Sequence, residues 1–305
     1  MTKLKTLIYF YKNPRKLIRL LGDYKLFNWL PDQIYLKFVY WGETGKKLNL
    51  DTPITFNEKL QWIKLNDRKP EYSKYADKYN VRSYVSKIIG EQYLIPLLGV
   101  YDSVEEIDWD SLPNKFVLKC THGSGSNIIC TDKEILDIEV TKMKLGKWMK
   151  KSWYWFGREW CYKDIKPRII CEKYLVDESG TELKDYKIFC FNGEPKLIQV
   201  DFSRFVEHKR NLYSVDWKYV DGTIKYPNQP SFNIKKPQKL DDMLRCAKIL
   251  SGNIPHVRID FYSINDQIYF GEMTFYHGSG YEEFEPESLG ILMGSWIDLP
   301  IYLCK

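Results

Sequence analysis

The sequence predicts an α+β protein in which antiparallel sheets and helices form separate lobes. Three observations support this class. The first third has helical apolar spacing, the remainder contains several pairs of strand-like runs, and short turn sequences join those pairs. Hairpins mixed with helices argue against a regular βαβ arrangement, in which a helix follows each strand. At 305 residues the chain is long enough for two lobes or two domains.

Helical signals dominate the first third. Thr55 and Glu58 form a capping box, in which each side chain satisfies a backbone N–H group at the start of a helix. A second helix is expected over residues 71–89, where it stops at Gly90. The Lys- and Trp-rich residues 133–160 and the later residues 238–251 are also expected to be helical.

Strand-like runs begin after Pro96. They are residues 115–120, 127–131, 168–176, 185–191, 196–202, 256–263 and 267–275. Asn192-Gly193 separates two of them and is a strong hairpin signal, because both residues accept the positive φ that a tight turn requires.

The composition limits the classes of function. The net charge of +6 and a pI near 8.7 suit an anionic ligand such as a nucleotide or an acidic sugar. The basic residues are too scattered for a nucleic-acid-binding face, so we expect no nucleic-acid partner. Seven Cys residues without CxxC or zinc-type spacing indicate reduced thiols and a cytoplasmic location. No run approaches the roughly 20 apolar residues of a transmembrane helix.

Residues 3–26 are basic and amphipathic. Such a segment could lie on an anionic membrane surface, which would place the protein at the inner face of the cell membrane. A helical cap packed on the body of the protein explains the same pattern, and both interpretations stay open.

A glycine-containing loop follows Lys119 between two strand-like runs. It contains Gly123, Ser124, Gly125 and Ser126. Because glycine has no side chain to block a close approach, backbone N–H groups of such a loop can contact phosphate oxygens. An ordinary hairpin loop is the alternative, and the sequence does not decide between them.

Two charges lie within an otherwise apolar strand-like run. Strand alternation places Asp185 and Lys187 on one face. Buried charges need a partner or a ligand. A bound ligand and a salt bridge to a neighbouring strand both satisfy this requirement, and we favour the ligand.

The most specific pattern lies in the last strand pair. Arg258, Asp260, Glu272 and Thr274 all occupy even positions. A three-residue turn centred near Asp266 would place Asp260 opposite Glu272 and Arg258 opposite Thr274, with all four on one face. Two adjacent carboxylates repel unless a cation lies between them, and Mg²⁺ prefers such hard oxygen ligands. A pair of solvated strand acids is the alternative, but the apolar flanking residues favour a metal site.

The ordered set of motifs resembles the ATP-grasp superfamily, and most closely its TupA-like branch, which is named for a protein of teichuronopeptide synthesis. The set comprises Lys119 with its loop, Glu172-Lys173-Tyr174-Leu175, Asp185-Tyr186-Lys187, and the Arg258/Asp260 and Glu272/Thr274 pairs. The resemblance extends from about Tyr40 onward and includes the segments Phe56–Lys64 and Ala76–Val85.

The resemblance implies two α+β lobes that clasp ATP and Mg²⁺, with a helical N-terminal region over 1–95, a small lobe over 96–172 and a large lobe over 173–305. Arg258 and Lys187 would stabilise the transferring phosphoryl group. The expected nucleotide ligands are Lys119, Gly123, Ser124, Gly125, Ser126, the hinge Glu172, Lys173, Tyr174 and Leu175, and Asp185. The expected magnesium ligands are Asp260, Glu272 and Thr274, which stands where many relatives have Asn. The residues assigned to the second substrate are Arg204, His277, Gly278 and Ser279.

By the same resemblance, the expected activity is ATP-dependent ligation of a carboxylate to an amine through an acyl phosphate. The expected substrates are a uronic-acid group of a surface polysaccharide, carried on a sugar nucleotide or lipid, and an amino acid or other amine. One alternative is a sugar-nucleotide glycosyltransferase that uses Asp108 and Asp110 as a DxD motif. A second is an ATP-grasp kinase acting on a sugar or polyol hydroxyl, and a third is a binding module without catalysis.

Overall fold

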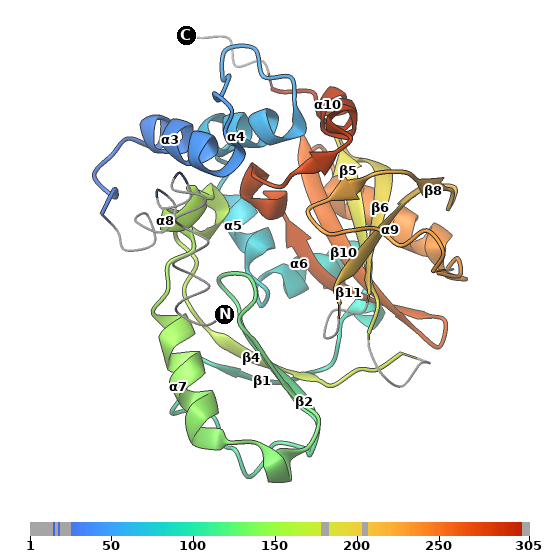
Figure 1. The fold of residues 1–305 in the computed structure, drawn as a ribbon. Helices are drawn as coiled ribbons and strands as arrows, with labels where there is room; N and C mark the ends of the chain where they lie inside the picture. The colour runs from blue at the N-terminus through green and yellow to red at the C-terminus, as the bar shows by residue number, and fades with distance from the viewer. Residues whose placement is uncertain are drawn as a thin grey trace.

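The computed structural model describes residues 15, 18, 26–177, 183–202, 207–232 and 234–300, which form two antiparallel sheets and the helices that cover them (Figure 1). A third, two-stranded ladder pairs β9 (Thr223–Ile224) with β12 (Phe284–Glu285). Arg204 and nearly all of residues 3–26 lie outside the described residues.

The smaller sheet has four strands in the order β1-β4-β2-β3. Its strands are β1 (Leu97–Tyr101), β2 (Phe116–Cys120), β3 (Asn127–Cys130) and β4 (Ile169–Lys173). Helix α7 (Ile138–Met149) runs along this sheet in Figure 1, and its Leu145 packs into the same core as Phe116 and Leu118 of β2. This lobe therefore has a core of its own.

The larger sheet has six strands in the order β11-β10-β5-β6-β7-β8. They are β5 (Asp185–Phe191), β6 (Glu194–Phe202), β7 (Lys209–Ser214), β8 (Tyr219–Val220), β10 (His256–Ile264) and β11 (Gln267–Thr274). The amphipathic helix α9 (Leu240–Ser251) packs on β5, β6 and β10. The Asn192-Gly193 turn predicted from the sequence joins β5 to β6, and both residues have positive φ.

The N-terminal helices lie beside the large sheet. They are α3 (Asp32–Thr44), α4 (Phe56–Asn66), α5 (Glu71–Ala76) and α6 (Val81–Ile88), followed by the 3-10 turn η2 (Glu91–Tyr93). The capping box of Thr55 and Glu58 is confirmed at the start of α4. The opposite end of the chain returns to this helix, because α10 (Glu287–Ser295) packs against α4.

Two predicted helices are broken in the structure. The helix expected over 71–89 divides at Asp77, whose carboxylate accepts hydrogen bonds from the backbone N–H groups of Tyr79 and Asn80 and so competes with helix continuation. The helix expected over 133–160 divides into the 3-10 turn η3 (Lys133–Ile135), α7, α8 (Tyr154–Gly157) and η4 (Trp160–Tyr162). The bulky aromatic residues after α7 are weak helix formers, which is consistent with this break.

Among the described residues, no helix has both the length and the apolar content needed to cross a bilayer. The six described cysteines are all buried free thiols.

Candidate functional site

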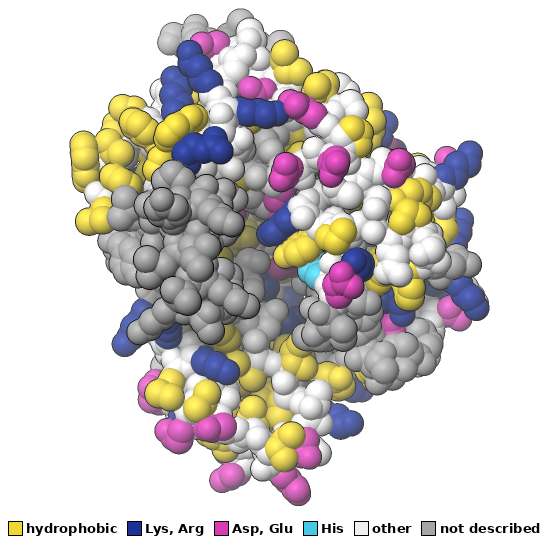
Figure 2. Space-filling view, in the orientation of Figure 1, with side chains coloured by type: hydrophobic (Ala, Val, Ile, Leu, Met, Phe, Trp, Pro, Cys, Tyr) yellow, Lys and Arg dark blue, Asp and Glu magenta, His cyan; other side chains and the backbone are white. Residues whose placement is uncertain are grey.

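A cavity of about 910 Å³ opens between the two lobes. Its lining includes residues of the β2–β3 hairpin of the small sheet, of β5, β7, β10 and β11 of the large sheet, and of the loop after β11. Figure 2 shows the surface hollowed at this position, with acidic and basic side chains along its edge. The volume is at the upper end of the range usual for small-molecule sites.

The β10–β11 hairpin has the cross-strand register expected from the sequence. Asp260 lies opposite Glu272, and Arg258 lies opposite Thr274. The turn itself differs from the prediction, because only Asn265 and Asp266 separate the strands. A bulge between Asp260 and Phe261 adds one residue to β11 and restores the predicted pairing. All four polar side chains line the cavity.

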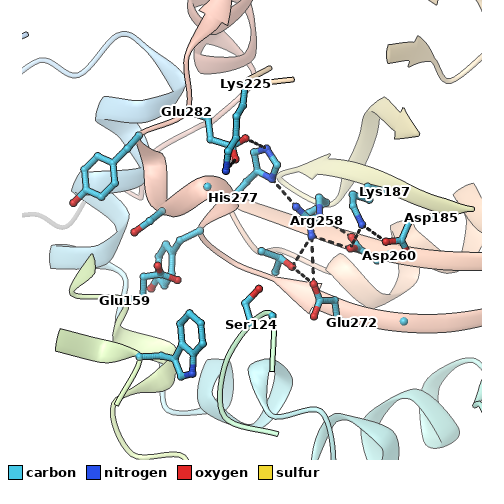
Figure 3. A pocket seen from close by; sticks show the side chains of 18 of the residues that line it. Ser124, Glu159, Asp185, Lys187, Lys225, Arg258, Asp260, Glu272, His277 and Glu282 are labelled. Carbon is cyan, nitrogen blue, oxygen red and sulfur yellow. Dashed lines mark hydrogen bonds and ion pairs between the residues drawn. The ribbon is translucent and has the colours of Figure 1, made fainter. Parts of the chain in front are cut away.

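Arg258 connects the polar groups of this hairpin (Figure 3). Its Nε donates to Asp260 Oδ1 at 2.7 Å, and its Nη2 donates to Asp260 Oδ2 at 2.8 Å and to Thr274 Oγ1 at 3.1 Å. The same Nη2 lies 3.4 Å from Glu272 Oε1. One guanidinium therefore joins two carboxylates that would otherwise repel each other.

Lys187 supplies a second cation on the neighbouring strand. Its Nζ donates to Asp185 Oδ2 at 2.6 Å and to Asp260 Oδ2 at 3.0 Å (Figure 3). Lys187 lies opposite Asp260 in the β5–β10 register, so the sheet itself sets this contact. Both residues of the predicted Asp185/Lys187 pair line the cavity.

The cations govern the protonation of this centre. Burial alone would raise the pKa of Glu272, but the charges of Lys78, Arg258 and Lys187 outweigh it and lower the pKa to about 2. For Arg258, burial opposes the charge, and Asp260 and Glu272 outweigh that effect and raise its pKa. Glu272 therefore stays ionised at neutral pH and Arg258 stays cationic.

The β2–β3 loop brings part of the glycine-containing segment to the cavity. Lys119, Ser124 and Gly125 line it, whereas Gly123 and Ser126 do not. Gly123 packs so closely on Trp153 that a Cβ there would lie 1.9 Å from the indole Nε1. Gly125 has φ +70°, a conformation that favours glycine. Close packing and backbone conformation thus explain why two glycines occupy this loop.

Lys78 is a cavity residue whose role the sequence did not indicate. Its Nζ donates to the carbonyl oxygen of Gly123 at 2.5 Å and lies 3.2 Å from Glu272 Oε2. It thus contacts the glycine-containing loop of one lobe and the carboxylate hairpin of the other. The hydrogen bonds of Asp77 interrupt the helix just before Lys78 and so set the direction of the lysine side chain. An Asp within a run expected to be helical is the sequence signal that could have indicated this break.

The segment Glu172–Leu175 does not line this cavity in the described structure. The Glu172 carboxylate instead lies 2.7 Å from Lys119 Nζ and 3.1 Å from Arg82 Nη1, and it is buried. It thus pairs with Lys119, the lysine expected from the sequence to contact phosphate. The adenine-hinge role of Glu172, Lys173, Tyr174 and Leu175 stays a prediction.

The loop after β11 forms the opposite end of the cavity. His277, Gly278 and Ser279 all line it, and their assignment to the second substrate stays a prediction. Gly278 and Ser279 both have φ +55°, which is strained for the serine. Arg204, the remaining residue of that group, lies outside the described residues.

Asp108 and Asp110, the DxD pair of the glycosyltransferase alternative, are exposed and do not line the cavity. Asp108 Oδ1 accepts backbone hydrogen bonds from Asp110 at 3.2 Å and Ser111 at 3.4 Å. This is the geometry of a side-chain-stabilised turn, which explains these residues without a ligand.

The donor set of the hairpin fits Mg²⁺ bound together with a phosphate. No group of three or more His, Cys, Asp or Glu side chains is arranged as a metal site within the part of the chain that the structure describes. Mg²⁺ does not require such a group, because it takes one or two carboxylates from a protein and its remaining ligands from phosphate and water. Asp260, Glu272 and the Thr274 hydroxyl provide hard oxygens on one wall of the cavity.

The fold and this site define an ATP-grasp protein. The family model for TupA-like ATP-grasp proteins matches residues 58–298, so the chain belongs to the TupA-like ATP-grasp family. This finding confirms the fold class and the family expected from the sequence. A comparison with curated proteins finds no match.

Several solved structures resemble the chain at low identity. D-alanine–D-alanine ligase from Bacillus anthracis is 13% identical with a TM-score of 0.36, and the match covers 72% of this chain and 58% of that one. N5-carboxyaminoimidazole synthetase from Staphylococcus aureus, complexed with ADP, is 15% identical with a TM-score of 0.43, covering 82% and 61%. The ATP-grasp ligase PsnB, complexed with a phosphomimetic variant of its minimal precursor, Mg and ADP, is 10% identical with a TM-score of 0.39, covering 78% and 65%. The chain thus spans about three fifths of the length of these proteins, and likenesses of this size do not bear on its activity.

Proposed function

We propose that this protein is an ATP-dependent ligase that joins a carboxylate to an amine through an acyl phosphate. The observation that carries the proposal is the convergence of four cations, Lys78, Lys119, Lys187 and Arg258, on one cavity that also holds the facing carboxylates of Asp260 and Glu272. Phosphoryl transfer is catalysed mainly by positioning and charge stabilisation, and this arrangement is suited to both.

Each side chain has a role in the proposed site. Lys119 and the backbone of the Gly123–Ser126 loop would contact the nucleotide phosphates from the small lobe. Asp260, Glu272 and Thr274 would hold Mg²⁺, which would supply positive charge against phosphate oxygens.

In the first step, a substrate carboxylate oxygen forms a bond to the γ-phosphorus of ATP, and the bond from that phosphorus to the β–γ bridging oxygen breaks. The products are an acyl phosphate and ADP. Arg258 and Lys187 lie on adjacent strands of the large sheet and would hold the charge that develops on the transferring group. In the second step, an amine forms a bond to the acyl carbon, and phosphate leaves.

For the substrates, we propose a uronic-acid group of a surface polysaccharide precursor as the carboxylate and an amino acid or similar amine as the nucleophile. The membership in the TupA-like family supports this pair, and the Lys and Arg side chains in the cavity lining can pair with the carboxylate of an acidic sugar.

We also propose that residues 3–26 associate with an anionic membrane surface, where such precursors would be carried. The first 26 residues contain seven Lys and Arg against one Asp, so the entire net charge of +6 lies in them. Helix α3, which follows this segment in the sequence, exposes Ile34, Phe38 and Trp41 along one stripe, and these apolar side chains would add to membrane binding.

A thermal-shift titration tests the nucleotide site without knowledge of the acceptor. Mg-ATP and Mg-ADP should raise the melting temperature by mass action, and Glu272→Gln should weaken that effect. A shift only with Mg-UDP-sugars, unaffected by Glu272→Gln, would contradict the proposal and favour the glycosyltransferase alternative.

A trapping experiment then separates ligase from kinase chemistry. With Mg-ATP, a panel of uronic acids and hydroxylamine, a ligase should release ADP and yield a hydroxamate, because hydroxylamine attacks an acyl phosphate. A kinase acting on a hydroxyl should release ADP and yield a stable phosphate ester without hydroxamate.

A further inference from the structure

Beside the phosphoryl-transfer centre, the cavity has a second buried polar centre around Glu282. His277, Arg210 and Lys225 surround the carboxylate of Glu282, and all four residues line the cavity. Glu282 Oε2 lies 2.8 Å from His277 Nε2 and accepts from Arg210 Nη1 at 3.4 Å, while its Oε1 accepts from Lys225 Nζ at 3.3 Å. Figure 3 shows Glu282 between Lys225 and His277, at the side of the site away from Ser124. No role was assigned to Glu282, Arg210 or Lys225 from the sequence.

His277 joins the two centres. Arg258 Nη1 donates to His277 Nδ1 at 2.6 Å. Because a guanidinium can only donate, Nδ1 must accept, so the imidazole proton lies on Nε2, which is 2.8 Å from Glu282 Oε2. Burial lowers the pKa of His277, which agrees with a neutral ring in this position. A single imidazole therefore spans the distance from the arginine of the phosphoryl centre to the carboxylate of Glu282.

The charge of Glu282 is stable at neutral pH. Burial alone would raise its pKa, but the contacts with His277, Arg210 and Lys225 outweigh burial and hold the pKa well below its usual value. The side chain is 9% exposed, so one edge of a fixed anion faces the cavity. Such a carboxylate pairs with a cation and does not take its proton.

Lys225 differs from the other partners of Glu282. Its side chain is 52% exposed, whereas that of Arg210 is 5% exposed. Its backbone has φ +64°, a conformation that side-chain-bearing residues adopt rarely and that often marks a functional constraint. Arg210 is further fixed by Asp201, whose Oδ1 accepts from Arg210 Nε at 2.7 Å. Lys225 is thus the partner that a ligand can displace.

The loop that carries Glu282 is held by one face of α4. Asn57 Nδ2 donates to the carbonyl oxygen of Glu282 at 2.8 Å, Gln61 Nε2 donates to that of Ser279 at 3.0 Å, and Lys64 Nζ donates to that of Ser279 at 2.8 Å. These residues recur at intervals of four and three, so all three reach the same side of the helix. This support fixes the strained loop, and pre-organised groups bind a ligand without the cost of ordering them first.

We propose that Glu282 is the binding site for the primary ammonium group of the nucleophilic substrate, and that the Lys225 ammonium stands in for that group in the structure described. The proposal rests on the ligase function proposed above. The ligand class is a primary amine, such as an amino acid, delivered to the side of the cavity that His277 joins to Arg258. Arg210 and His277 position Glu282, and Glu282 contacts the substrate.

The chemistry balances with this assignment. The ammonium loses one proton to water on leaving the carboxylate, and its nitrogen lone pair forms the C–N bond to the acyl carbon. The bond from that carbon to the phosphate oxygen breaks. The second proton of the nitrogen goes to the departing phosphate, so an ammonium and an acyl phosphate dianion yield an amide, HPO₄²⁻ and one free proton.

The test measures amine binding to the full chain in the presence of saturating Mg-ADP. The probes are ethanolamine and the common L-amino acids other than proline and lysine, each paired with its N-acetyl form, which has no ammonium group. Proline is left out because it is a secondary amine, and lysine because its Nα-acetyl form keeps an ammonium group. At least one amine should raise the melting temperature of the wild-type protein, and its N-acetyl form should not. Glu282→Gln should raise the dissociation constant of that amine by about tenfold or more, because a hydrogen bond to a charged group is lost.

Two further variants sharpen the result. Glu285→Gln removes an exposed carboxylate that does not line the cavity and should leave the dissociation constant within about twofold, within the scatter expected of surface substitutions. Lys225→Met removes the competing ammonium and should bind the amine at least as tightly as the wild type. The proposal is overturned if Glu282→Gln binds the amine as tightly as the wild type. It is also overturned if the wild-type protein binds Mg-ADP but binds none of the amines. A wild-type protein that does not bind Mg-ADP instead refutes the proposed function.

Discussion

Replacing Glu272 by glutamine tests whether the cations of the cavity stabilise its carboxylates. Glutamine has nearly the same shape as glutamate and can still accept a hydrogen bond from Thr274, whose Oγ1 lies 3.2 Å from Glu272 Oε1. It cannot provide the negative charge that Lys78 and Arg258 face at 3.2 Å and 3.4 Å. The substitution therefore removes mainly the charge.

The expected loss of stability follows from the pKa. The pKa of Glu272 falls from 4.5 to about 2 in the folded protein. A shift of that size corresponds to about 3 kcal/mol, and because the side chain is 29% exposed, solvent screening reduces the expected loss to about 2–3 kcal/mol.

The sign with pH is fixed by the direction of the shift. Because the folded-state pKa is lowered, the stabilisation is fully present above the ordinary value of 4.5 and is lost as the pH falls toward 2. Urea unfolding should show a constant difference between wild type and Glu272→Gln from about pH 6 to pH 8, and a smaller difference below about pH 4.5.

The matched control is Glu285→Gln, since Glu285 is exposed on the short strand β12. It should change stability by less than about 0.5 kcal/mol. A Glu272→Gln variant as stable as the wild type at pH 7, or a difference that grows as the pH falls below 4.5, would refute the reasoning.

Four other predictions concern the glycine-containing loop, the cavity residue Lys78, the DxD pair and membrane binding. Gly123→Ala should lower the melting temperature in a thermal scan because its Cβ would lie 1.9 Å from Trp153 Nε1. Gly146→Ala should leave it unchanged or raise it, because apart from the backbone of its own helix and its chain neighbours no atom lies within 4 Å of the new Cβ. Lys78→Met should weaken Mg-ATP binding by about tenfold in calorimetry. The matched control Lys74→Met, at an exposed lysine on α5, should leave that binding unchanged. Asp110→Ala should leave ligase turnover unchanged, since its position in an exposed turn assigns it no catalytic role; a loss of turnover would revive the glycosyltransferase alternative. The full chain should co-sediment with anionic phosphatidylglycerol vesicles but not with phosphatidylcholine vesicles, and added salt should release it; equal binding to both would contradict the role assigned to residues 3–26.

The carboxylate hairpin could be predicted from sequence because strand alternation is local. Even spacing placed Arg258, Asp260, Glu272 and Thr274 on one face, and any turn that pairs Asp260 with Glu272 also pairs the other two. The predicted turn was one residue too long and the predicted strand lacked a bulge. These two errors cancel in the register, so the facing pairs were correct although the backbone path differed.

Lys78 and Glu282 could not be found in the same way, because their positions depend on tertiary contacts. Apolar spacing predicted one helix through Asp77, and the side-chain hydrogen bonds that break it have no periodic signature. Glu282 meets Arg210 only because the loop after β11 folds back over β7, 72 residues away in the chain. Periodic spacing in the sequence carries no information about such a long-range contact.

The polar groups of the cavity form a connected network, and this connection bears on how the site would bind a nucleotide. From Lys187 the contacts run through Asp260, Arg258, His277, Glu282 and Arg210 to Asp201, which lies 3.9 Å from Lys187 again. Each buried charge thus has a partner, so the protein avoids the large penalty of an isolated buried ion.

A network of this kind can exchange partners without leaving a charge uncompensated. Phosphate oxygens would replace carboxylates as partners of Lys78 and Arg258, while Mg²⁺ would replace those cations as the partner of Asp260 and Glu272. Because the side chains are already held by the sheet, the exchange needs little rearrangement of the protein, which is the condition under which fixed charges stabilise a transition state most effectively. The same exchange at Glu282, with a substrate ammonium replacing Lys225, would extend this principle from the nucleotide to the amine.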